Sequence, residues 1–346
     1  MASKRGCGKV SGSANCNGRG HVNRSQGRGR GHQVGTGTSL PNMSTRAGIL
    51  ADGLSHVGFD ASRQKCREEL LLRRFRAHYG VGPGAIMNLF SDLQRYQPEK
   101  SHELRYVFMA ASWLKLYDTE EVMAGRWQFG EEHCRNKVKD YVERIQQLKP
   151  LKISFRGLNR NCGFLPVDTV HVRSQEFRCN PSSKWFSHKF NGPGVSFEVV
   201  NDPIDGNFRW INGPEESSQH DLTILRGGRK GKTKKWDKSS LYFQMKALQE
   251  KYNVKLVGDS AYEGQADVVT TTKDAHKPAT KKLFARMKSM QETCFKRLKD
   301  FKVLRESFRH GKKGTADKLE AIQRSFEATA VLLQYDFEDG YRLFEV

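Results

Sequence analysis

The sequence predicts a mixed α/β protein: a β-sheet flanked by helices, preceded by an all-helical region and a disordered N-terminus. Apolar residues recur at helical spacing from about Lys65 to Leu148, and from Ile153 the pattern changes to short strands rich in Val and Phe. Three strands come first, and a helix, a further strand and a long helix follow. This order favours a mixed sheet with helices on its faces.

Residues 1–60 differ from the rest of the chain. They contain 13 glycines and eight Lys or Arg but only two acids, and their few apolar residues show no period. Such a segment cannot bury enough surface to offset the entropy of ordering, so we expect it to be disordered. Its Arg-Gly steps between Arg19 and Arg30 could contact RNA or DNA, and a basic tail without a specific partner is the alternative.

The whole chain has 346 residues and a formal net charge of +21, which favours nucleic acid or an anionic membrane surface as a partner. It contains no run of about 18 apolar residues, so we expect no membrane-spanning helix, and its N-terminus lacks the apolar segment of a secretory signal. Its seven cysteines form no Cys-x-x-Cys pair. This argues against a disulfide framework and for a reducing compartment.

Three helices are expected at the start of the helical region, residues 65–150. Arg67–Tyr79 is followed by Gly80, which suits the left-handed position after a helix, and Pro83 can begin a second helix that ends at Tyr96. Ser101 is expected to cap a third helix. The apolar stripe of that helix would consist of Leu104, Val107, Phe108, Ala111 and Leu114.

The rest of this region has the outline of a DNA-binding helix-turn-helix. A short helix over Thr119–Gly125 and a long helix over Glu131–Leu148 are separated by a turn that contains glycine. The long helix would turn its apolar residues to the core and leave four basic residues outside: Arg135, Lys137, Lys139 and Arg144. The first three of these, Arg135, Lys137 and Lys139, are candidate DNA contacts. Any small helical bundle gives the same outline, so a purely structural role is the alternative.

The sheet region covers residues 153–336. Its expected strands are Gly163–Arg173, Val195–Asn201, Asn207–Asn212 and Asn253–Gly258. A short helix is expected over Gln219–Leu225, a long helix over Pro278–Phe301, and a last helix around residues 319–333. The long helix carries an apolar stripe at helical spacing, made of Leu283, Met287, Met290, Cys294 and Leu298.

Three acidic residues stand out in the sheet region. Asp168 interrupts a Val-rich strand, where a buried carboxylate is costly unless a cation, a hydrogen-bond network or a metal compensates for it. Asp259 follows an apolar strand, and ligands gather at the carboxyl ends of strands in open α/β sheets. Glu292 lies on the long helix, opposite the apolar stripe. Each also has a structural explanation: an exposed edge-strand face, a turn cap, and an i,i+4 pair with Lys296.

Taken together, these acids form an Asp-Asp-Glu set, with 90 residues between the first two and 32 between the last two. Converging carboxylates repel one another, and divalent cations relieve that repulsion. Two Mg²⁺ ions about 3.5–4 Å apart can activate the attacking oxygen and stabilise the leaving oxygen in phosphoryl transfer. We therefore predict that Asp168, Asp259 and Glu292 are catalytic and bind two Mg²⁺ or Mn²⁺ ions.

Basic residues near these acids are candidates to hold the DNA backbone. Lys296 and Lys299 share the face of Glu292 on the long helix. The run from Arg226 to Lys238 has seven basic residues and one acid. It could grip phosphates or act as a nuclear localisation signal, and a solvated loop is the alternative. The candidates for phosphate contacts within it are Arg229, Lys230, Lys234 and Lys235.

Several motifs in this order resemble PIF/Harbinger-type transposases, within the DDE superfamily of endonucleases. The resemblance covers roughly residues 153–334, with a weaker match over residues 74–151. It is carried by Val-Asp-Thr-Val-His at 167–171, Phe-Ser-His-Lys at 186–189, Ser-Gln-His-Asp at 218–221, Gly-Asp-Ser-Ala-Tyr at 258–262, and Glu292 with Arg-Leu-Lys at 297–299. Thr169 and Phe295 depart from the family, which usually has Gly and Asn at these positions.

The resemblance implies a ribonuclease-H-like fold and a nuclear, metal-dependent DNA endonuclease and strand transferase of a cut-and-paste transposon. It implies DNA as the partner, both transposon ends and target, together with a separate DNA-binding accessory protein, and a homo-oligomer is compatible with it. Two alternatives stay open. One is a host-adopted derivative that binds DNA without cutting it, and the other is an RNA-binding protein that uses the Arg-Gly tail.

Overall fold

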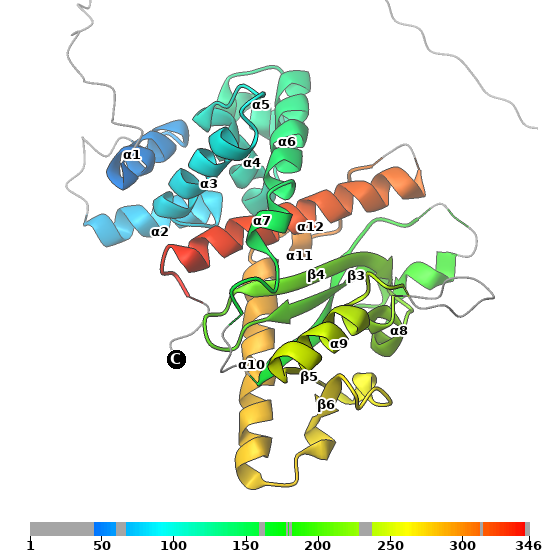
Figure 1. Ribbon diagram of the computed structural model, residues 1–346. Helices are drawn as coiled ribbons and strands as arrows, with labels where there is room; N and C mark the ends of the chain where they lie inside the picture. Colours follow the sequence, from blue (N-terminus) through cyan, green and yellow to red (C-terminus); the bar gives the residue numbers. More distant parts are fainter. Residues whose placement is uncertain are drawn as a thin grey trace, which may run out of the picture. The chain divides into compact units, whose positions relative to one another are not determined.

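The computed structural model describes residues 45–59, 67–158, 163–177, 179, 182–227, 237–311 and 314–342. They lie in one compact unit, Leu40–Val346. Within this unit a helical part precedes a curled mixed sheet flanked by helices, so the predicted α/β class is confirmed (Figure 1). The disorder expected for residues 1–44 concerns a segment outside the described residues.

The described helices before the first strand are α1 (Arg46–His56), α2 (Glu68–Tyr79), α3 (Pro83–Tyr96), α4 (Leu104–Leu116), α5 (Glu120–Trp127), α6 (Glu131–Gln146) and α7 (Lys149–Lys152). Among them, α2 to α6 follow the sequence prediction closely, whereas α1 and α7 were not predicted. Gly80 ends α2 in the left-handed region at φ 79°, and Pro83 begins α3, as predicted. The prediction for α4 was wrong at its start, because Glu103 and not Ser101 is the N-cap residue. In the described part of the chain, no helix is both long and apolar enough to span a membrane.

The prediction that residues 1–60 are disordered was wrong for residues 46–56, because these form helix α1. Its residues Ile49, Leu50 and Leu54 are buried in the same core cluster as α2 and α4. Gly53 lets the helix approach its neighbours closely, because a Cβ atom there would lie 2.4 Å from the ring of Phe75. The apolar stripe of α1 is short and interrupted by glycines, so the sequence pattern does not predict a helix there. Packing against α2 and α4 stabilises it.

The sheet is built from strands β1 (Phe164–Arg173), β2 (Phe186–Ser187), β3 (Gly192–Asn201), β4 (Phe208–Glu216), β5 (Lys255–Gly258) and β6 (Val269–Thr271). Its order is β2-β3-β1-β5-β6, and β4 pairs with β3. The β1–β3 and β3–β4 pairs are antiparallel, whereas β5 runs parallel to both β1 and β6. Strand β1 is therefore central, which puts the expected strand Gly163–Arg173 in the middle of the sheet.

Alternation along the strands gives the sheet two covered faces. Val170 and Phe197 face α12 (Thr315–Glu338), where Phe197 stacks on Phe326 at a ring-centroid distance of 3.8 Å. The same face is bordered by α10 (Pro278–Lys299) and α11 (Lys302–Arg305). Leu165 and Val167 face the other way, toward α8 (Asp221–Leu225) and α9 (Leu241–Tyr252). The sequence did not predict α9.

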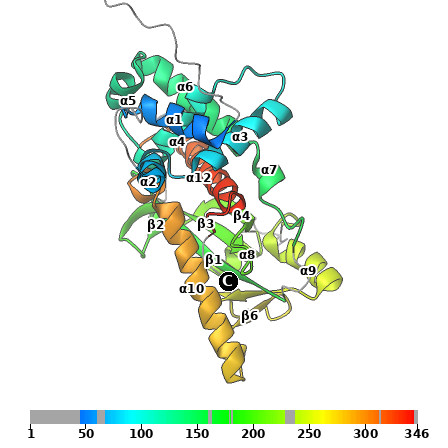
Figure 2. The ribbon, with the colours of Figure 1, turned by 90° about the vertical axis from the view of Figure 1, so that its left-hand side faces the viewer.

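The long helix α10 matches its prediction except for one stripe residue. Met287, Met290, Cys294 and Leu298 are buried as expected, but Leu283 is 41% exposed and Phe284 is buried in its place. Phe284, one position along the chain from Leu283, packs against Phe164 of β1 and Val257 of β5, so it occupies the place predicted for Leu283. The N-terminal end of α10 extends away from the helical part (Figure 2).

A buried acid joins the helical part to the sheet part. Asp336 on α12 accepts hydrogen bonds from Arg76 at 2.6 Å, from Arg297 at 3.0 Å and from the backbone N–H of Gly82 at 2.8 Å. Its side chain is fully buried. Three elements, α2, α10 and α12, thus converge on one carboxylate, whose charge is compensated by two guanidinium groups.

We expect Asp336→Ala to destabilise the protein by about 3–5 kcal/mol, because it leaves two arginines facing an uncompensated, largely buried space. Urea unfolding followed by circular dichroism measures this loss. Glu338→Ala on the same helix is the control, because Glu338 pairs with Lys152 at the surface and such a pair contributes about 0–1 kcal/mol. Equal losses for the two variants would contradict the anchoring role of Asp336.

Candidate active site

The pairing of β1 with β5 brings Asp168 and Asp259 to neighbouring positions. Pro166 lies opposite Val257 in the parallel register, and each aspartate comes two residues later on its own chain segment. Both positions fall where β5 ends. Because β1 is the central strand, Asp168 does not lie on an exposed edge, and that alternative for it is wrong.

Local hydrogen bonds fix the two aspartates. Asp168 accepts a bond from the backbone N–H of Thr169 at 2.7 Å, and Asp259 accepts one from Ala261 at 2.8 Å. Asp259 thereby caps a single 3₁₀ turn, Ser260–Tyr262, so the turn-cap explanation for it holds. The same carboxylate keeps its other oxygen for further ligands, so the cap and a functional role are compatible.

A third aspartate, Asp221, joins this pair. The Thr169 hydroxyl donates a 2.7 Å hydrogen bond to Asp221 Oδ1, and Asp221 is the first residue of α8. The His-Asp sequence at 220–221 belongs to one of the family-like motifs, but the sequence alone did not place it in the site. Thr169, a departure from the family pattern, therefore has a defined contact in this chain.

Electrostatics show how closely the three aspartates are grouped. Burial raises the pKa of Asp168 to about 6, and the charges of Asp221 and Asp259 act in the same direction, whereas Lys189 and the Thr169 N–H oppose it. Burial also raises the pKa of Asp221, again with Asp259 adding to the effect. Carboxylates that are largely buried and repel one another in this way form a site that favours a cation.

A lysine lies among these acids. Lys189 donates a hydrogen bond from Nζ to the carbonyl oxygen of Thr169 at 3.2 Å, and its charge lowers the pKa of both Asp168 and Asp221. Lys189 follows β2 in the Phe-Ser-His-Lys motif at 186–189. Its position next to the acids places one protein cation inside the site.

Glu292 approaches the site from α10 but is less closely grouped. Its side chain is exposed, and it forms no ion pair with Lys296 within the described residues, so the i,i+4 explanation is not realised. Lys299 links it to the aspartates: burial lowers the pKa of Lys299, with Lys189 and Arg173 adding to the effect, whereas Glu292 and Asp168 oppose it. Glu292 and Asp168 therefore share Lys299 as a neighbour.

The donor set suits Mg²⁺ or Mn²⁺, which prefer hard carboxylate oxygens. In the described ranges, however, no group of three or more His, Cys, Asp or Glu residues is arranged to hold a metal ion. The ligand set of Asp168, Asp259 and Glu292 stays a prediction.

Some of the predicted DNA contacts on α6 are engaged within the protein. Arg135 pairs with Glu120 at 2.7 Å, and Lys137 lies 4.5 Å from the ring centroid of Tyr106. Arg144, expected outside, has a largely buried side chain that bonds Asp140 and the carbonyl oxygen of Ser101. Lys139 is exposed. The predicted contacts Arg229, Lys230, Lys234 and Lys235 lie outside the described residues.

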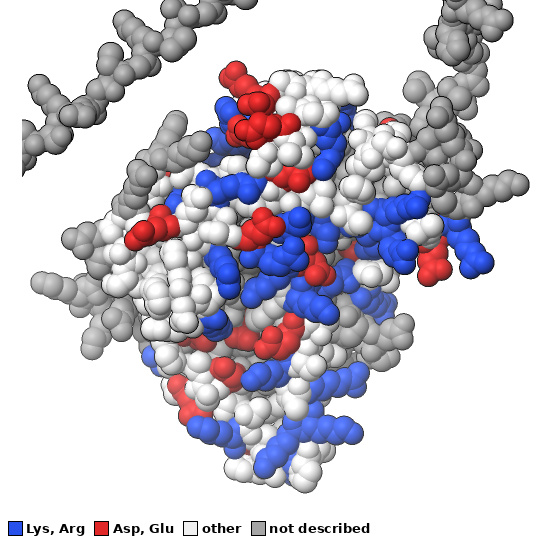
Figure 3. Space-filling view, turned by 180° about the vertical axis from the view of Figure 1, so that it is seen from behind, with Lys and Arg blue, Asp and Glu red and all other residues white. Residues whose placement is uncertain are grey.

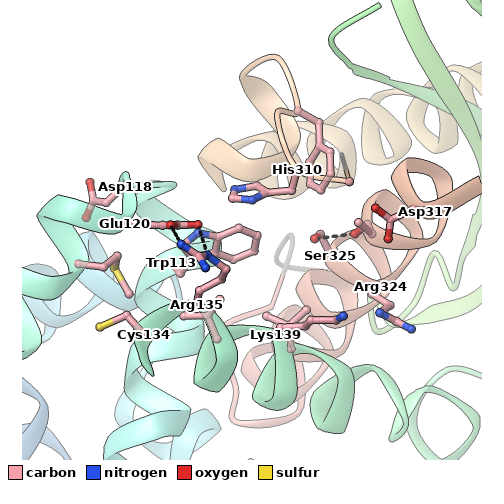
Figure 4. A pocket seen from close by; sticks show the side chains of 16 residues that line it. Trp113, Asp118, Glu120, Cys134, Arg135, Lys139, His310, Asp317, Arg324 and Ser325 are labelled. Atoms are coloured by element: carbon pink, nitrogen blue, oxygen red, sulfur yellow. Dashed lines mark hydrogen bonds and ion pairs between the residues drawn. The ribbon is translucent and has the colours of Figure 1, made fainter. Parts of the chain in front are cut away.

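A cavity of about 300 Å³ lies beside α6. Arg135 and Lys139 line it, together with residues of α4, α5 and α12 (Figure 4). Its walls also carry acids, namely Asp118, Glu120 and Asp317. Because acids lie beside the basic residues, this cavity does not present a purely basic surface to a phosphate.

A fourth carboxyl was missed by the sequence analysis. Glu198 on β3 is fully buried, accepts a hydrogen bond from the Trp210 indole N–H at 3.0 Å, and has no partner for its Oε1 atom among the described residues. Burial raises its pKa to about 8, and Glu215 and Asp221 act in the same direction. This pKa favours the protonated form of Glu198 at neutral pH. The signal was the one used for Asp168, an acid inside an apolar strand.

Comparison with known proteins addresses the sheet part of the chain. Residues 167–334 match the family model of the DDE superfamily endonucleases. The match supports a DDE transposase-type domain. It includes all three predicted acids and Asp221. No curated protein and no solved structure matches the chain.

The buried carboxyl of Glu198 predicts a pH effect on stability. The pKa of Glu198 is higher in the folded protein than its ordinary value of 4.5, so folding retains a proton that the unfolded chain releases. Stability should be fully present below about pH 4.5 and fall as the pH rises through about 8, by about 1.4 kcal/mol per pH unit. We expect Glu198→Gln to show a smaller loss; the part that remains comes from Asp168 and Asp221, whose pKa values are also raised.

Unfolding by urea at a series of pH values measures this effect. Glu263→Gln is the matched control, since Glu263 is exposed and should leave the wild-type pH dependence unchanged. If Glu198→Gln shows the same pH dependence as the wild type, Glu198 does not titrate as proposed.

Proposed function

We propose that this chain is a divalent-metal-dependent DNA endonuclease and strand transferase of a cut-and-paste transposon, of the PIF/Harbinger type. The observation that carries the proposal is the grouping of Asp168, Asp221 and Asp259 within the segment that matches the DDE superfamily endonucleases. The fold we assign to the domain is ribonuclease-H-like. Its sheet supports this, because an antiparallel set of strands adjoins two parallel strands through the central β1.

We assign Asp168, Asp259 and Glu292 as the metal ligands, with Asp221 beside them. When bound, two Mg²⁺ or Mn²⁺ ions would supply activation of the attacking water or 3′-hydroxyl and stabilisation of the leaving oxygen. The chain itself supplies charge and position. Lys189 is placed to offset the charge of Asp168 and Asp221, and it would orient a phosphate that enters between them.

DNA binding would extend from this site along α10 through Lys296 and Lys299. The α5–α6 segment would act as a helix-turn-helix, with the exposed Lys139 as its available cation. We further propose a nuclear location, a DNA-binding accessory protein and a homo-oligomer as the working form. A host-adopted derivative that binds DNA without cutting is the second candidate, and Phe295 in place of the family's Asn is the feature that favours it.

We expect purified protein to nick a labelled transposon-end duplex only with Mg²⁺ or Mn²⁺. Asp168→Asn and Asp259→Asn should abolish cleavage, and Glu292→Gln should impair it severely, because each removes a charged oxygen ligand while keeping the side chain's size. Asp221→Asn should also lower the rate. DNA affinity should change little, since Lys and Arg contacts supply it.

Glu263→Gln, which alters an exposed acid in the same domain, is the control for the cleavage assay. Cutting without metal, or cutting that survives Asp259→Asn, would overturn the mechanism. Full DNA binding with no cutting by the wild type, on every end sequence and with every accessory fraction tested, would favour the host-adopted derivative.

The helix-turn-helix makes a separate prediction. Charge reversal at Lys139 and Arg135 should weaken DNA binding and reduce its salt dependence, because the slope of log K against log salt falls by about 0.9 for each phosphate that is no longer neutralised. Binding titrations at several salt concentrations measure this slope. Because Arg135 pairs with Glu120, the single Lys139→Glu variant separates an effect on DNA binding from an effect on packing. An unchanged slope for Lys139→Glu would leave α6 with a structural role only.

A further inference from the structure

The exposed side of α10 is strongly basic well before it reaches the proposed site. Over Pro278–Lys299 the helix has seven Lys or Arg and one acid, Glu292. Its first two-thirds carry four exposed cations, Lys281, Lys282, Arg286 and Lys288. These residues precede the glutamate, and neither the family motifs nor the proposed ligand set includes them.

These four cations have no acidic partner in the described part of the chain. None of them forms an ion pair or a side-chain hydrogen bond there. Some other exposed cations do have acidic partners: Arg135 pairs with Glu120, Lys184 with Glu216, and Lys273 with Glu263. The four cations of α10 have none among the described residues, so their charge is available to a ligand.

The placement of these cations also costs helix stability. The first turn of α10 has no acid, and Lys281 and Lys282 lie at the positive end of the helix dipole. Lys282 and Arg286 form a like-charged i,i+4 pair, which destabilises a helix by about 0.2–0.5 kcal/mol. Such an arrangement is unfavourable in the free protein and becomes favourable beside a polyanion.

The cations form a row that leads to the site. Lys281, Lys288, Glu292 and Lys299 are separated by 7, 4 and 7 residues, which places them on one face of the helix. At about 1.5 Å per residue the row from Lys281 to Lys299 is about 27 Å long, or about eight base-pair steps of about 3.4 Å. Figure 2 shows the N-terminal end of α10 lying away from the helical part of the unit, so a long ligand can pass along it.

We propose that the exposed face of α10 around Lys281 and Lys288 binds the phosphate backbone of duplex DNA on one side of the cut, and so fixes the direction in which DNA crosses the site. This rests on the proposed function. The row is straight and basic, and it contains the predicted catalytic glutamate. An extended row of this kind fits the continuous phosphate backbone of DNA better than a compact acidic ligand. Figure 3 shows that Lys and Arg side chains are gathered both near the middle and at the lower end of the face seen from behind.

Salt-dependent binding to a duplex tests the proposal. In an Asp259→Asn background, which keeps the DNA uncut, Lys281→Gln/Lys288→Gln is compared with Lys246→Gln/Lys251→Gln on α9. The control pair removes the same charge from a helix on the other face of the sheet. We expect the α10 pair to lower the slope of log K against log salt by about 1.8 and the affinity at 0.15 M salt by about 30-fold. The α9 pair should leave both unchanged.

The outcomes separate this proposal from the proposed function. If the two pairs bind DNA alike while the wild type cuts DNA, the α10 surface is wrong and the nuclease stands. If the α10 pair alone loses slope while the wild type never cuts, the surface stands and the nuclease fails. A loss of slope confined to duplex RNA, or no duplex binding by the Asp259→Asn protein, would overturn the proposal. Circular dichroism of both variants checks that α10 still folds.

Discussion

The parallel pairing of β1 with β5 is the constraint on which the proposed site depends. It puts Asp168 level with Asp259, and Thr169, the next residue on β1, bonds Asp221 from the opposite side. A shift of one residue in this register would turn Asp168 to the other face of the sheet. Asp168 in the central strand and Asp221 at the start of α8 are both largely buried, so little water screens the repulsion between the carboxylates.

That pairing needs a stable sheet, and α12 provides much of its support. The helix lies between the helical part and β3–β4, and it stacks Phe326 on Phe197 while Asp336 binds arginines from α2 and α10. One end of α10 is therefore anchored in the core, and the other end extends beyond the sheet. A helix held in this way can carry a costly row of cations, since core packing near Leu298 offsets the local repulsion.

The protein separates its charges according to surroundings. Acids that lie deep in the sheet, Glu198 and Asp168, have raised pKa values, whereas cations collect on the outer side of α10 and around the site. On α6, by contrast, Arg135 and Arg144 are bound to acids of the same part of the chain. A net charge of +21 alone does not show which basic residues are available to a ligand.

The sequence by itself determined most element types, because periodicity, Gly80 and Pro83 act locally. It identified Asp168 because an acid within an apolar strand is costly, and Asp259 because it follows the end of a strand. It did not determine α1 and α9, whose short apolar stripes become stable only by packing. Only the tertiary structure decided that Asp221 belongs beside the two aspartates, that Arg144 is buried and that Lys281 and Lys288 are unpaired. The physical reason is that pairing and burial depend on residues distant in sequence, which no local pattern records.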